Sequence, residues 1–85
     1  MIYGMQFEIP GKHRVFYKAT NFQEGIIVTT YLILPNLSKT DDITLTEVGD
    51  GLYCFDYDFV TYGKYGCLIK EDGIKKIFFA IQVGD

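Results

Sequence analysis

A chain of 85 residues is long enough for one domain and too short for two. Its composition, with 48% hydrophobic and 22% charged residues, is that of a folded globular protein and excludes a disordered chain. The formal net charge is −3, and the eight basic residues are scattered along the sequence. Because nucleic acids and anionic membranes are bound by clustered cationic side chains, neither is expected as a partner.

Turn signals rich in Gly, Pro, Asn and Asp divide the chain into short runs that have the Val, Ile, Thr, Tyr and Phe content of strands. No segment longer than one turn keeps a helical apolar period, so we expect a single all-β domain over residues 1–85. The expected strands cover residues 3–8, 13–19, 25–34, 43–48, 51–58, 64–71 and 74–83. Seven short strands at this spacing are typical of a two-sheet sandwich or a small barrel.

The third expected strand is apolar on both faces. Its alternate positions form two sets, Ile27, Tyr31 and Ile33 on one side and Val28, Leu32 and Leu34 on the other. A central strand covered on both sides has this pattern, and so does a strand whose outer face contacts another subunit. Since a seven-stranded sandwich covers each sheet on one side only, we expect an interface here, with Ile27, Tyr31 and Ile33 as candidate contact residues. The alternative is that the N-terminal segment folds over this face.

Alternation is clearest in the later strands. Within 51–58 three aromatic side chains share one face, and a cysteine and two carboxylates share the other, so the aromatic face should point inward. The expected outward set there is Cys54, Asp56 and Asp58. The expected inward sets are Ile43 and Leu45, then Tyr53, Phe55 and Tyr57, then Tyr65, Cys67 and Ile69, and finally Ile77, Phe79, Ile81 and Val83.

Few residues of the chain are suited to catalysis or metal binding. The one histidine, His13, lies between Lys12 and Arg14 beside a turn, a setting more typical of a solvated strand end than of a general base. Nothing in the sequence brings it to Cys54 or Cys67, and a nucleophile needs a base in reach. Structural zinc takes four Cys or His ligands, and the chain has three in total. We therefore expect a non-enzymatic protein without catalytic, metal or cofactor-binding residues.

Two acidic or glycine-rich features have ordinary explanations. Asp50, Asp56 and Asp58 are oxygen donors that calcium could use at a strand end, but outward carboxylates on an exposed strand also serve solubility. The triplet Gly49-Asp50-Gly51 does not precede a helix, as a phosphate-binding loop does, and is instead typical of a hairpin turn.

The cysteines and the N-terminus bear on the compartment. The chain lacks an apolar run of about 20 residues, and its first residues lack the basic start and apolar core of a secretory signal. We expect synthesis and folding in the cytoplasm. Cys54 and Cys67 face opposite ways on their strands, so both are expected to be reduced thiols.

The segment Tyr62-Gly63-Lys64-Tyr65 places Tyr65 just after a glycine, at the entry of the penultimate strand and two residues before Cys67. This resembles the tyrosine corner of Greek-key sandwiches, although an ordinary inward tyrosine gives the same pattern. Together with Ile43 to Asp58, it makes residues 24–83 similar to the second half of immunoglobulin-like modules. The paired cysteine and the tryptophan of antibody domains are absent, so no disulfide is implied.

This resemblance implies an antiparallel two-sheet Greek-key sandwich of about seven strands, with Tyr65 as a structural residue whose hydroxyl bonds back to the backbone. Similar halves occur in bacterial surface repeats, transthyretin-like domains and small accessory structural proteins of tailed-bacteriophage virions. A free-standing module with its own Met and no secretion signal is most similar to the last group. A place in a phage head or tail is the expectation that follows from this likeness.

Two kinds of non-enzymatic function remain. The first is a structural protein that acts through protein–protein contacts, with copies of itself or within a larger assembly. The second is a small carbohydrate- or ligand-binding module that uses exposed tyrosines (Tyr3, Tyr17 or Tyr62) and aspartates. The chain has no Trp, the residue on which sugars often stack, so the first function is favoured.

Overall fold

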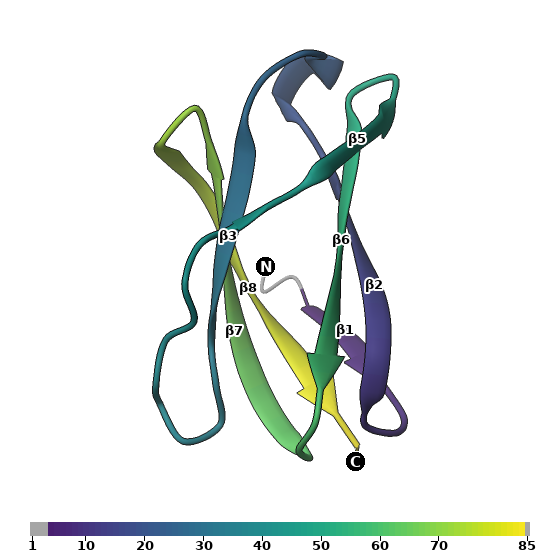
Figure 1. Cartoon of the computed structure of the whole chain (residues 1–85), viewed down its shortest axis with the longest axis vertical. Helices are drawn as coiled ribbons and strands as arrows, with labels where there is room; N and C mark the ends of the chain where they lie inside the picture. The colour runs from purple at the N-terminus through teal and green to yellow at the C-terminus, as the bar shows by residue number, and fades with distance from the viewer. Residues whose placement is uncertain (1–3, 85) are drawn as a thin grey trace.

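The computed structural model describes residues 4–84, which form two β-sheets packed face to face (Figure 1). The five-stranded sheet has the order β1 (Gly4–Phe7), β8 (Ile74–Val83), β7 (Gly63–Glu71), β3 (Val28–Ile33) and β4 (Ile43–Thr44). The three-stranded sheet has the order β2 (Gly11–Lys18), β6 (Leu52–Phe59) and β5 (Thr46–Gly49). The expected all-β sandwich is therefore confirmed.

Helical structure in the described part of the chain amounts to one short turn. This turn, η1 (Thr20–Phe22), connects β2 to β3. No helix among residues 4–84 is long and apolar enough to cross a membrane.

The described strands differ from the expected ones in two respects. The run 43–48 is two strands, because the chain passes from one sheet to the other at Leu45 (Figure 1). The Leu45 side chain is buried between the sheets, and its N–H donates to the Val28 carbonyl at 2.8 Å. In addition, β1 runs parallel to β8, whereas antiparallel pairing was expected throughout. The first expected strand began at Tyr3, which lies outside the described residues.

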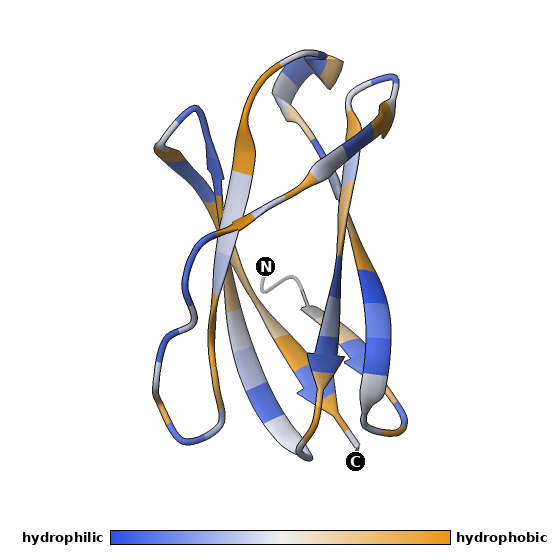
Figure 2. Cartoon of the chain, viewed as in Figure 1, coloured by the Kyte–Doolittle hydropathy of each residue, from blue (hydrophilic) through white to orange (hydrophobic). Residues whose placement is uncertain are grey.

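The core lies between the sheets and follows the expected alternation. On β6, the rings of Tyr53 and Phe55 are buried while Asp56 and Asp58 are exposed. The inward residues of β7 and β8 are mostly buried in the same way. Three residues expected to point inward are only half-buried and pack against the edge of the core: Ile43, Tyr57 and Ile77. Figure 2 shows the polar stretch of β2 and the apolar residues of β3 on the two sides of the sandwich. Burial of these apolar side chains is the main force that holds the two layers together.

Tyr65 fixes the connection between β6 and β7. Its ring is buried, and its hydroxyl donates to the Thr61 carbonyl at 2.9 Å and contacts the Thr61 hydroxyl at 3.0 Å. This is the bond, back to the backbone a few residues upstream, that a tyrosine corner makes. It holds the turn 60–62 at one end of the sandwich.

Candidate functional site

The outer face of the five-stranded sheet includes the residues singled out on the third strand. Val28, Thr30 and Leu32 point into the core, so Tyr31 and Ile33 are on the outer face, half-buried. Ile27 lies just before β3 and is exposed. The inner face is less apolar than expected, because Thr30 is fully buried. Its hydroxyl donates to the Leu68 carbonyl at 2.8 Å, which satisfies its hydrogen-bonding need inside the core.

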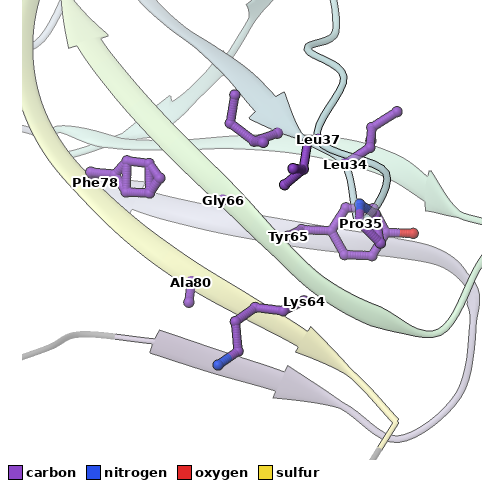
Figure 3. Close-up of a pocket in the computed structure, with 9 residues that line it drawn as sticks. Leu34, Pro35, Leu37, Lys64, Tyr65, Gly66, Phe78 and Ala80 are labelled. Atoms are coloured by element: carbon purple, nitrogen blue, oxygen red, sulfur yellow. The ribbon is translucent and has the colours of Figure 1, made fainter.

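An apolar groove of about 440 Å³ lies on this outer face, between the end of β3 and the middle of β8 (Figure 3). Its lining has one charged residue, Lys64, and is otherwise mainly apolar. The lining residues are Ile33, Leu34, Pro35, Leu37, Lys64, Tyr65, Gly66, Phe78 and Ala80. We call this surface the sheet groove.

A glycine shapes one side of the sheet groove. A Cβ atom on Gly66 would lie 2.6 Å from Cζ of Phe78, so the aromatic ring rests directly over the backbone of β7. Cross-strand aromatic contacts of this kind protect a glycine in a sheet. The ring nevertheless stays 57% exposed. Sequence reasoning missed Phe78 and Gly66, because their contact depends on the pairing of β7 with β8.

The loop after β3 forms the opposite side. The Leu34 N–H donates to the Ser38 carbonyl, and the Leu37 N–H donates to the Leu34 carbonyl, both at 2.8 Å. The Asn36 side chain accepts from the Ser38 N–H at 3.0 Å and its hydroxyl at 2.6 Å. Leu37 is held at φ 72°, in the left-handed region that a leucine rarely adopts, and is 83% exposed. The loop thus presents a large apolar side chain to solvent in an ordered turn.

Lysines border the apolar surface. The Lys39 Nζ lies 4.4 Å from the centroid of the Tyr31 ring, and the Lys70 Nζ lies 5.6 Å from it. Lys70 also pairs with Asp42 at 3.2 Å. Cation–π contacts at exposed sites contribute about 0.5–1 kcal/mol each, so these lysines stay near the ring. The face is therefore apolar and locally basic on a chain whose net charge is −3.

His13 is not the solvated strand-end residue that was expected. Its ring is half-buried and stacks on Phe7, with the centroids 4.1 Å apart and the planes 4° from parallel. Its Nε2 lies 2.9 Å from the Ile9 carbonyl oxygen. The expectation was wrong because odd positions of β2 point toward the core, and at this end of the strand the core is aromatic.

The cysteines and aspartates are dispersed. Cys54 lies on the outer face of the three-stranded sheet and Cys67 in the core beside β3, and both are free thiols. Burial raises the pKa of Cys67 to about 11. Asp56 forms a 2.7 Å ion pair with Arg14, which lowers the pKa of that carboxyl. Among residues 4–84, no three His, Cys, Asp or Glu side chains gather at one point.

A buried carboxylate at the opposite end of the sandwich was not anticipated. Glu71 is 4% exposed and accepts hydrogen bonds from the Tyr17 hydroxyl at 2.5 Å, the Thr20 N–H at 2.9 Å and the Thr20 hydroxyl at 3.2 Å. Burial alone would raise the pKa of Glu71, but these bonds together lower it. Burial and the neighbouring carboxylate raise the pKa of Tyr17 to about 12. The group joins β2 and η1 to the end of β7.

These contacts change the set of tyrosines available to a ligand. Tyr17 is half-buried and its hydroxyl is bonded to Glu71, so it is not an exposed platform. Tyr62 is exposed, as expected. Tyr3 lies outside the described residues.

No protein-family model matches the sequence, and no curated protein matches it significantly. Among solved structures, the chain is similar to part of a crystal structure named as a "putative glycoside hydrolase" from Bacteroides vulgatus, with a TM-score of 0.58 and 8% sequence identity. The match covers 96% of this chain and 16% of that one. At this identity the likeness shows a shared fold alone.

Proposed function

We propose that this chain is a non-enzymatic structural module that binds another protein through the outer face of its five-stranded sheet. The observation that carries the proposal is the sheet groove, with Phe78 and Leu37 exposed on either side of it. A contiguous exposed apolar surface on a small domain usually marks an interaction site. The positive φ of Leu37 adds to this argument, because non-glycine residues held in the left-handed region cluster at functional sites.

The charges on this face favour a different protein over a second copy of the chain. In a two-fold dimer the same surface meets itself, and because Lys64 is the one charged residue that lines the sheet groove, a second copy would bring a like charge to it. Lys70 is already paired with Asp42. A partner with an apolar ridge flanked by Asp or Glu would instead fill the groove and pair with the lysines. The proposed occupant is such an acidic, apolar-ridged protein surface.

The proposed setting is a larger assembly, and the resemblance to small accessory proteins of tailed-phage virions suggests a phage head or tail. The non-enzymatic part of the proposal is supported by what the reactive side chains do. His13 is stacked on Phe7, and the Cys67 thiol is buried with a raised pKa. The hollow that His13 lines with Lys12, Arg14 and Asp56 holds no Ser or Cys for it to activate, and its Nε2 already contacts the Ile9 carbonyl.

A pair of charge substitutions tests the proposal. Phe78→Glu places a carboxylate in the sheet groove, and Phe16→Glu is the matched control, because Phe16 is 50% exposed on the outer face of the other sheet. Tagged wild type and both variants are purified from the native source, with thermal unfolding measured to confirm that each is folded. We expect one and the same protein to copurify with wild type and Phe16→Glu and to be lost from Phe78→Glu. Equal recovery with all three proteins would contradict the assignment of this face.

A further inference from the structure

A second groove, of about 460 Å³, lies at the end of the sandwich where the β6–β7 turn meets the loop after β3 (lower end in Figure 1). It differs from the sheet groove in being lined by polar and aromatic side chains together. Its lining comprises Leu34, Pro35, Asn36, Tyr57, Asp58, Val60, Thr61, Tyr62 and Tyr65. Its volume is within the roughly 300–1,000 Å³ of small-ligand sites. We call it the end groove.

Tyr62 provides a flat aromatic surface in the end groove. A Cβ atom on Gly84 would collide with Cδ1 of Tyr62, so the ring rests against the backbone of that glycine. Gly84 is itself buried, and its N–H donates to the Phe7 carbonyl at 2.8 Å. The turn that carries Tyr62 is fixed by the bond between Tyr65 and Thr61. The ring is therefore supported from one side and remains 65% exposed.

Three polar groups line the same groove with free hydrogen-bonding capacity. The Tyr57 hydroxyl makes no hydrogen bond to any described residue. Because every fully buried side-chain polar atom among the described residues has a partner, this unpartnered hydroxyl must be accessible to solvent. The Asp58 carboxylate is exposed. Asn36 uses its oxygen to accept from Ser38, which leaves its NH₂ group as a donor. The groove thus offers an acceptor, a donor and a hydroxyl that can do both.

We propose that the end groove binds a neutral sugar unit of an oligosaccharide or polysaccharide. A pyranose ring has a face of C–H bonds that fits the open face of Tyr62. Its rim of hydroxyl groups can donate to Asp58 and accept from Asn36, with the Tyr57 hydroxyl serving either role. The end groove adjoins the sheet groove and shares Leu34, Pro35 and Tyr65 with it. Tyr62 and Asp58 line the end groove and not the sheet groove, whereas Phe78 lines the sheet groove alone, so substitutions at these residues test the sugar site and the proposed protein contact separately.

Other ligand classes fit less well. An anion would meet the Asp58 carboxylate without a cation among the lining residues. A quaternary ammonium group is held between several aromatic faces, whereas of the three tyrosines in this lining Tyr62 is exposed, Tyr57 is half-buried and Tyr65 is buried in the core. A purely apolar ligand would leave the three polar groups unpaired.

Native gel electrophoresis in gels that contain soluble polysaccharides tests the proposal. The probes are β-glucan, xyloglucan, arabinoxylan, galactomannan and starch, with choline-agarose as a separate cation probe. We expect at least one neutral polymer to retard the protein, and oligosaccharides of the same polymer to reverse the retardation. Tyr62→Ala should weaken the affinity by about tenfold or more, since the stacking surface is lost, while Tyr62→Phe should bind as wild type does.

Two further variants complete the design. Asp58→Asn keeps the size of the side chain and should weaken binding severalfold, because a charged acceptor is replaced by a neutral one. Phe78→Glu in the sheet groove should leave sugar binding unchanged. The proposal is overturned if no neutral polymer retards the protein, if Tyr62→Ala and Asp58→Asn both bind as wild type does, or if choline-agarose retains the protein in preference to the sugars.

Discussion

Replacing Tyr65 with Phe removes one hydroxyl from the connection between β6 and β7 and leaves the buried ring in place. The hydroxyl donates to the Thr61 carbonyl at 2.9 Å and contacts the Thr61 hydroxyl at 3.0 Å, and the residue is 2% exposed. A net intramolecular hydrogen bond contributes about 0.5–1.5 kcal/mol, and an unpaired buried partner costs about 1–3 kcal/mol. Thr61 itself is exposed, so water can hydrogen-bond in part to the Thr61 carbonyl and hydroxyl groups that lose their partner. The expected loss of stability is therefore about 1–2 kcal/mol.

Urea unfolding followed by tyrosine fluorescence measures this loss. With a slope of about 1 kcal/mol per molar urea for a small domain, the midpoint should fall by about 1–2 M. The control is Tyr62→Phe, which removes the hydroxyl of an exposed tyrosine directly before β7 and should leave the midpoint almost unchanged. Coincident midpoints for Tyr65→Phe and wild type would refute the idea that this hydroxyl pins the turn.

Three further outcomes follow from the structure. The pKa of Glu71 in the folded protein is below its ordinary value of 4.5, so its ionised form adds stability that is present above that pH and is lost as the pH falls through the lower folded-state pKa. Glu71→Gln should therefore lower the unfolding free energy at pH 7 and make it less dependent on pH in the acid range. An unchanged pH dependence in urea unfolding would argue against this role. Gly51→Ala should be more destabilising than Gly73→Ala in thermal unfolding. Both glycines have positive φ, but a Cβ on Gly51 would lie 2.5 Å from the backbone of η1, whereas a Cβ on Gly73 would meet open space. Equal costs would mean that η1 moves away freely from residue 51. Alkylation of the native protein should modify Cys54 and spare the buried Cys67, with both modified after denaturation; intact mass would show two adducts on the native protein if this is wrong.

The parts of the fold that follow from side-chain period were predictable from the sequence. The alternation along β6, β7 and β8 assigns Tyr53 and Cys67 to the core because successive side chains point to opposite faces of a sheet. The crossing at Leu45 was not predictable, since an apolar residue within a strand pattern looks the same whether or not the chain changes sheet there. Parallel pairing of β1 depends likewise on a partner, β8, at the other end of the chain.

The candidate sites were predictable only in part. The apolar outer face of β3 was visible in the sequence, and Tyr31 and Ile33 lie on it. The sheet groove, however, depends on the contact between Phe78 and Gly66, which the register of β7 and β8 creates and no local pattern encodes. Glu71 precedes an Asp-Gly turn and has the sequence context of a solvated charge. Its burial arises from η1 folding over it, which is a tertiary effect.

The central claim, that the outer face of the five-stranded sheet contacts another protein, is tested most directly by photo-crosslinking from two positions. A benzophenone amino acid replaces Phe78 in the sheet groove in one variant and Phe16 on the opposite sheet in the other, and each is illuminated in the native source. The account predicts one specific adduct from position 78, with a different protein whose crosslinked surface is apolar and flanked by acidic residues, and none from position 16. Adducts from position 16 alone, or a crosslink from position 78 to a second copy of this chain, would contradict it.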